Sequence, residues 1–165
     1  MTIFDIYQEV IDDWHWYHIS YVFRVLQRLH HNSDNTITNY NWSTTITRKN
    51  KSIDNKTFAV QAAKIAQDRH CTDIVVLDLR GKSPATEYFV IATGTSDRQA
   101  RTVTDEIQTL AKQNGFVRFG QAGYKQGRWI LIDYIDIVIH IFDEQYREYY
   151  DLEMLWGDAE KLKIE

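Results

Sequence analysis

The sequence predicts an α/β fold in which a mixed five-stranded sheet is flanked by helices, with a helical extension at the N-terminus. The chain has 165 residues, of which 44% are hydrophobic and 25% charged, a composition typical of globular proteins. All seven glycines and the one proline lie at or after Gly81, which concentrates tight turns in the C-terminal half. From residue 56, helical patterns and short β-rich runs follow in the order α-β-β-α-β-β-β-α, which favours a mixed sheet with helices packed on it.

Residues 1–31 are predicted to form the helical extension. Apolar side chains recur there at spacings of three and four, at Ile3, Tyr7, Val10, Trp14, Tyr17 and Tyr21. Acidic residues interrupt the apolar run, which excludes a signal segment. Residues 32–55 are predicted to be a polar linker, because Asn, Ser and Thr side chains dominate it and compete with the backbone for hydrogen bonds. The third unit is a folded domain over 56–162.

Apolar runs and turn residues define the elements of this domain. The runs 73–80 and 87–93 are apolar at successive positions, as in strands covered on two faces. The next helix has the clearest boundaries, because Ser96 and Gln99 have capping-box spacing and Gly115 is a typical left-handed stop. The other predicted elements are a helix over 56–70, strands over 116–119, 128–133 and 136–142, and a final helix over 144–156 with Tyr146, Tyr150, Leu152 and Leu155 at near-helical spacing.

Charge and cysteine content narrow the classes of function. The net charge of −4 argues against a general nucleic-acid-coating surface, although 19 Lys and Arg leave room for a local basic patch. No apolar run approaches the ~18 residues that span a bilayer, so no direct membrane contact is expected. The single cysteine excludes an intramolecular disulfide and a cysteine-rich zinc cluster. We therefore expect a soluble, intracellular protein.

The residues predict no catalytic site and no metal site. The segment 94–96 precedes a helix and has the amides to hold an anion, but a turn with an N-cap is the commoner interpretation. Asp133 and Asp136 are separated by a predicted turn, so they do not form a magnesium-binding pair on one strand face. We interpret His140 as a hydrogen-bonded sheet histidine and Cys71 as an inert thiol.

Two features favour an interaction surface. Trp129, Leu131 and Asp133 share one face of a predicted strand, while the other face carries Ile130 and Ile132. If the isoleucine face is core, the tryptophan face is exposed, and tryptophan is a typical binding anchor. Residues 143–165 hold eight acidic against three basic residues, which suits a basic protein partner, with a solvated helix face as the alternative.

Five blocks of the sequence resemble the Iojap family, the bacterial and organellar ribosomal silencing factors. In order and at the family's spacing, they cover about two-thirds of the chain, over residues 57–162. The blocks are 73–81, 88–99, 129–134, 138–142 and 147–156. The resemblance implies a nucleotidyltransferase-like α/β fold without an established catalytic role and without a cofactor.

The resemblance also implies a partner and a mode of action. Family members bind a basic, L14-type protein of the large ribosomal subunit, at the face that meets the small subunit. Occupying that face blocks subunit joining and represses translation. Family members can also self-associate as homodimers. The expected location is the cytoplasm, or an organellar stroma or matrix in a eukaryotic host.

Transferred to this sequence, the resemblance gives five partner-binding residues. Trp129 and Leu131 are expected to be apolar anchors. Asp133, Tyr134 and Glu148 are expected to be their polar neighbours. Two alternatives stay open: a residual nucleotidyltransferase-like enzyme, and an N-terminal helix that recruits another partner or a membrane surface.

The chain departs from the family pattern at two informative places. Ile135 stands where the family usually has glycine between tyrosine and aspartate. If that turn needs positive φ, a β-branched residue is strained there. Residues 1–54 have no counterpart in the common bacterial form of the family.

Overall fold

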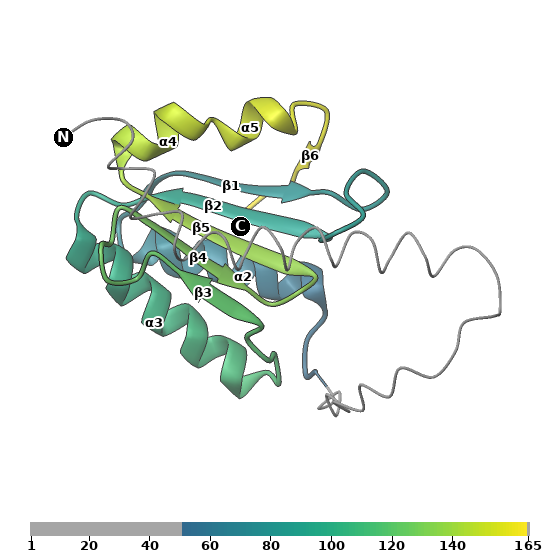
Figure 1. Ribbon diagram of the computed structural model, residues 1–165. Helices are drawn as coiled ribbons and strands as arrows, with labels where there is room; N and C mark the ends of the chain where they lie inside the picture. The colour runs from purple at the N-terminus through teal and green to yellow at the C-terminus, as the bar shows by residue number, and fades with distance from the viewer. Residues whose placement is uncertain (1–50, 165) are drawn as a thin grey trace, which may run out of the picture.

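The computed structural model describes residues 51–164, which build a six-stranded mixed sheet (Figure 1). Strands β2 and β5 run parallel, and the other neighbouring pairs run antiparallel. The strands lie in the order β3 (Gly120–Ala122), β4 (Trp129–Asp133), β5 (Ile137–Phe142), β2 (Tyr88–Thr93), β1 (Thr72–Asp78) and β6 (Glu160–Lys161). The predicted mixed sheet is confirmed, with one strand more than expected.

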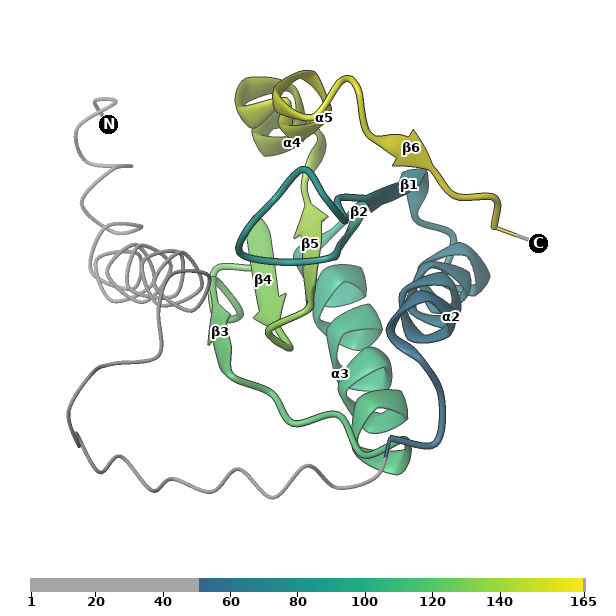
Figure 2. The same ribbon diagram turned by 90° about the vertical axis from the view of Figure 1, so that its right-hand side faces the viewer.

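Helices cover both faces of this sheet (Figure 2). Helices α2 (Asn55–Asp68) and α3 (Asp97–Gln113) lie on one face, and the short helices α4 (Glu144–Tyr150) and α5 (Leu152–Leu155) lie on the other. Helix α2 buries four alanines and Phe58, so its small side chains bring it close to the strands. Each of the six residues of β2 and of β5 is buried, which explains why both runs are apolar at successive positions.

Helix α3 begins and ends as its sequence predicts. The Ser96 hydroxyl accepts a hydrogen bond from the Gln99 amide at 3.2 Å, and the Gln99 side chain accepts one from the Thr95 amide at 2.7 Å. The helix is followed by Gly115, whose φ is 77°. These contacts confirm the N-cap interpretation of segment 94–96, and they use polar groups that an anion would need.

Two strands differ from the prediction. The strand expected over 116–119 is wrong: Phe116 leaves the sheet and stacks on Phe58, with ring centroids 4.2 Å apart, and the strand begins only at Gly120. The extra strand, β6, is two residues long and pairs with β1, too short to be recognised from its pattern. The predictions for residues 1–31, and for the linker up to residue 50, lie outside the described part of the chain.

The turn between β4 and β5 is strained at Ile135. This residue has a φ of 75°, and the Asp136 amide donates to the Tyr134 carbonyl at 3.0 Å across it. A turn with an i to i+2 hydrogen bond and positive φ at its centre is rare and strained for a residue with a side chain. The expectation of a strained β-branched residue here is therefore confirmed.

Candidate partner-binding surface

The joint between α4 and α5 decides which side chains reach the surface. Asp151 has a φ of 35° and a ψ of 60°, a left-handed conformation that aspartate tolerates better than most residues. Its carboxylate accepts a hydrogen bond from the Met154 amide at 3.3 Å and so caps α5. The single helix predicted over 144–156 is wrong because of this residue. Leu155, one of the four residues noted at near-helical spacing, lies after this break, and its side chain is 66% exposed.

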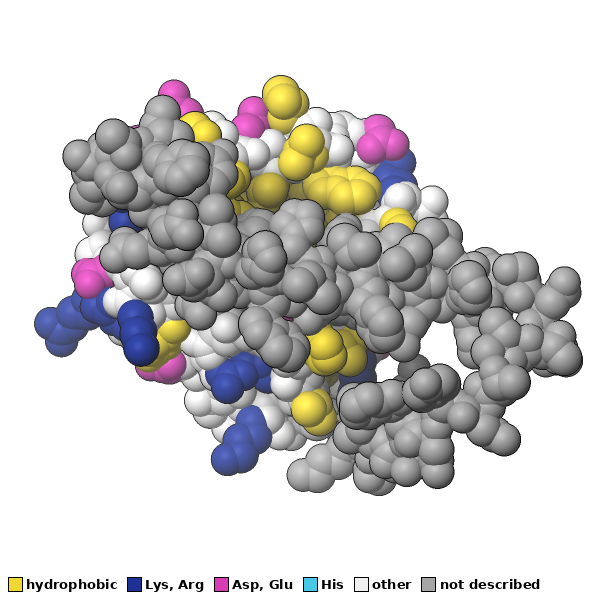
Figure 3. Space-filling view, viewed as in Figure 1, with side chains coloured by type: hydrophobic (Ala, Val, Ile, Leu, Met, Phe, Trp, Pro, Cys, Tyr) yellow, Lys and Arg dark blue, Asp and Glu magenta, His cyan; other side chains and the backbone are white. Residues whose placement is uncertain are grey.

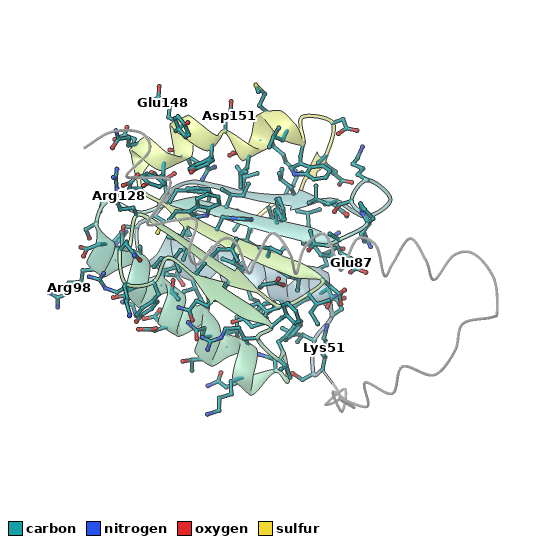
Figure 4. The ribbon with its side chains drawn as sticks, viewed as in Figure 1. Lys51, Glu87, Arg98, Arg128, Glu148 and Asp151 are labelled. Atoms are coloured by element: carbon teal, nitrogen blue, oxygen red, sulfur yellow. The ribbon has the colours of Figure 1, made fainter. Side chains whose placement is uncertain are left out.

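The outer sides of the two helices form a surface with acidic and apolar groups, which we call the α4–α5 surface. Met154 is 73% exposed and lies beside Leu155. Glu148 and Asp151 are exposed and point away from the sheet (Figure 4). Hydrophobic and acidic side chains lie together along this edge of the molecule (Figure 3). The acidic excess was visible in the sequence, whereas the exposure of Met154 and Leu155 depends on the left-handed joint and was missed.

Arg147 fixes this surface to the sheet from beneath. Its guanidinium donates to the Asp73 carbonyl at 2.8 Å and pairs with Glu153. A longer contact of 3.4 Å joins it to the Thr93 hydroxyl. One side chain therefore connects α4, the start of α5 and the ends of β1 and β2. Its positive charge faces inward and leaves the outer side of α4–α5 acidic.

The expected exposure of Trp129 is wrong. Its side chain is 7% exposed, because it packs in a second apolar cluster on the α4 side of the sheet. The indole ring lies 4.5 Å from the Tyr150 ring and 4.7 Å from the Phe142 ring, centroid to centroid. Its Nε1 donates to His140 Nδ1 at 3.2 Å. In this structure Trp129 supports α4 from below.

The other three residues predicted on strand β4 and its turn are also buried. Leu131 belongs to the same cluster as Trp129. The Asp133 carboxylate accepts from the Ile135 amide at 2.6 Å, which holds the strained turn. Tyr134 lies on the opposite face, with its ring 5.3 Å from that of Phe58, and burial raises the pKa of its hydroxyl. Of the five predicted residues, Glu148 is the one that reaches the surface.

His140 is held neutral inside the cluster. Burial, with a smaller contribution from the nearby charge of Arg147, lowers the pKa of His140 to about 3. Because Nδ1 accepts the Trp129 hydrogen bond, the ring proton of neutral His140 lies on Nε2. The interpretation of a hydrogen-bonded sheet histidine is confirmed.

The carboxylates do not converge on a metal. The Asp78 carboxylate is taken by the Arg80 guanidinium at 2.6 Å, which lowers the pKa of Asp78. Asp133 is bound to its own turn, and Asp136 interacts with Lys51 at 3.7 Å. Within residues 51–164 no three Asp, Glu, His or Cys side chains are grouped as metal ligands. Burial also raises the pKa of Cys71 to about 11, as expected of an unreactive thiol.

Comparison with known proteins gives a consistent family. Residues 52–165 match the family described as "Ribosomal silencing factor during starvation". The chain is 38% identical over 107 residues to ribosomal silencing factor RsfS of Bacillus subtilis, covering 65% of this chain and 91% of that protein. It is 33% identical to the chloroplastic protein Iojap of Zea mays over 107 residues, covering 65% of this chain and 46% of that protein.

A solved structure agrees with the fold. Protein CV0518 of Chromobacterium violaceum superposes with a TM-score of 0.61 at 30% identity, covering 67% of this chain and 92% of that one. No helix in the described part of the chain is both long enough and apolar enough to cross a membrane.

Proposed function

Because the chain belongs to the ribosomal silencing factor family, we propose that it binds the large ribosomal subunit through an L14-type protein and blocks joining of the small subunit. Translation is repressed by steric exclusion, since a protein docked at the joining face occupies space that the small subunit needs. No bond is made or broken, and no cofactor is required. The protein acts wherever its ribosomes are, in the cytoplasm or in an organelle.

The observation that carries this proposal is the chemistry of the α4–α5 surface. Segment 143–160 contains seven acidic residues and one basic residue, Arg147, which is turned inward. Acidic groups around an apolar centre steer a basic protein into contact and exclude water once it has docked. Met154 and Leu155 supply the apolar centre, and Glu148 supplies charge at its border.

The buried residues of the predicted site act through this surface. Trp129 and Leu131 form the floor under α4, and Asp133 holds the β4–β5 turn. Their loss changes the position or stability of the docking helices. Tyr134 is part of the core on the other face and has no direct role in docking.

Cosedimentation with isolated large subunits tests the docking surface. The double substitution Met154→Ala and Leu155→Ala removes the apolar centre without disturbing the buried clusters. We expect it to weaken binding by about tenfold or more, as for a hot-spot pair. Glu148→Lys is expected to slow association, with a larger effect at low salt. Asp68→Lys, at the end of α2 on the other side of the sheet, is the matched charge control.

Two results would contradict the proposal. Unchanged subunit binding by both α4–α5 variants would remove this surface from the interface. Wild-type protein that binds large subunits yet leaves their joining with small subunits unaffected, measured on sucrose gradients, would remove the silencing mechanism.

A further inference from the structure

A second charged surface lies along α3 and β3, away from α4 and α5. Between residues 107 and 127 the sequence holds three basic residues and no acidic residue. Together with the start of α3, they form what we call the basic strip, which consists of Arg98, Arg101, Lys112, Arg118 and Lys125. Lys and Arg side chains gather over this side in Figure 3, and Figure 4 shows Arg98 projecting from its end.

Side-chain contacts join the segments on either side of β3 to helix α3. An Arg101 guanidinium nitrogen donates to the Lys125 carbonyl at 3.2 Å. One turn further along α3, Asp105 accepts from the Tyr124 hydroxyl at 2.8 Å. At the next turn, Gln108 accepts from the Arg118 guanidinium at 2.5 Å. The cationic groups therefore follow one line along α3, which the Asp105 carboxylate interrupts between Arg101 and Arg118. From Arg98 to Lys112 this line is about 21 Å long at the helical rise per residue.

Most of the positive charge on the strip is not neutralised. Arg118 is held by two neutral oxygen acceptors, on Gln108 and Gln121, so its charge stays uncompensated. Lys112 and Lys125 are exposed, and no acidic side chain of the described residues pairs with either. Arg101 is the exception, because Asp97 lies 2.5 Å from its guanidinium.

We propose that the basic strip binds the phosphate backbone of ribosomal RNA beside the protein partner. Guanidinium and ammonium groups in a line make charge-assisted contacts to successive phosphates, and neighbouring glutamine amides donate to backbone oxygens. Such contacts position a protein without reading sequence. This inference rests on the proposed function for the identity of the RNA, but the chemistry of the strip stands independently.

The charge arrangement favours RNA over an anionic membrane. The strip is narrow, as is the backbone of one RNA strand, whereas a bilayer presents a plane of charge. On the remainder of the surface the net charge is negative, since the whole chain carries −4 despite the strip. The acidic α4–α5 surface is attracted to a basic protein and repelled by RNA, whereas the basic strip is attracted to RNA and repelled by a basic protein. Two surfaces of opposite sign fix the orientation of the docked molecule.

Salt dependence of binding to a synthetic RNA duplex tests the strip. The triple variant Lys112→Gln, Arg118→Gln and Lys125→Gln is compared with a matched variant, Lys64→Gln, Lys161→Gln and Lys163→Gln, which has the same net charge. We expect the slope of log affinity against log salt to fall by about three for the strip variant, one for each lost phosphate contact. The matched variant keeps the wild-type slope.

A second variant separates binding from folding. Lys112→Gln with Lys125→Gln removes no described side-chain hydrogen bond, and its slope is expected to fall by about two. Equal slopes for the strip and matched variants would overturn the proposal. So would wild-type protein that ignores RNA but binds phosphatidylserine vesicles. If large subunits are not bound while the duplex is bound through the strip, the proposed function fails and the strip stands. Loss of duplex binding alone removes the strip and leaves the proposed function intact.

Discussion

At position 135, glycine is expected to give a more stable protein than alanine, against the usual order of these two residues. Ile135 occupies the centre of the β4–β5 turn with a φ of 75°. An L-residue in the left-handed region costs roughly 1–2 kcal/mol, which glycine avoids. Glycine in turn adds unfolded-chain entropy, which opposes folding by about 0.4–1 kcal/mol. The energy of the backbone strain is larger than the entropic cost of glycine.

The alanine variant at the same position makes this comparison clean. Ile135→Gly and Ile135→Ala both lose the packing of the half-buried isoleucine, so this loss cancels between them. What differs is the strain, which alanine retains, and the chain entropy. We expect the glycine variant to be more stable than the alanine variant by about 0.5–1 kcal/mol. For a domain of this size, that difference raises the melting temperature by about 2–4 °C.

Urea and thermal unfolding of the two variants measure the difference. Val117 provides the control, because it is exposed and has no positive φ. There the order reverses, and Val117→Gly is expected to be less stable than Val117→Ala by about 0.5 kcal/mol or more. If Ile135→Gly is no more stable than Ile135→Ala, the turn is not strained as described.

Three further outcomes follow from the packing. His140 stays neutral in the folded protein and becomes protonated in the unfolded chain, so the unfolded chain binds more protons below about pH 6.5. In urea unfolding, wild type is therefore expected to be about 2 kcal/mol less stable at pH 5 than at pH 6.5. The His140→Gln variant is expected to lack that loss. An identical pH dependence in both would contradict the buried neutral ring. Trp129→Ala is expected to cost about 3–5 kcal/mol of stability, as for other buried aromatic side chains. An unchanged melting temperature together with lost subunit binding would instead restore Trp129 as an exposed anchor. Gly127→Ala is expected to lower the melting temperature, because Gly127 has a φ of 71° and the new Cβ would lie 2.6 Å from the Asp97 Cβ. A variant as stable as wild type would show that the loop moves freely off α3.

Local signals predicted the elements that local chemistry determines. Ser96 and Gln99 define the start of α3 through side chains that bond to nearby amides, so the sequence alone is enough. The strain at Ile135 was expected from the family resemblance, because the family usually has glycine at this place in the turn. The break at Asp151 was not predicted, because aspartate accepts both helical and left-handed conformations. Arg147 pairs with Glu153 across this break and donates to the Asp73 carbonyl, and these tertiary contacts are not visible in the sequence.

The prediction that Trp129 is exposed was wrong for a physical reason that the sequence already indicated. Alternation along β4 separates its two faces but does not say that either one is exposed. The neighbouring strand β5 is buried at every position, and it pairs with parallel β2, which is buried throughout as well. Strands of this kind need a cover on both faces. Trp129 pairs with Phe142 in the register of β4 and β5, so the layer that covers Phe142 also covers the indole. An anchor for a partner must therefore be sought on the outer side of that layer, on α4 and α5.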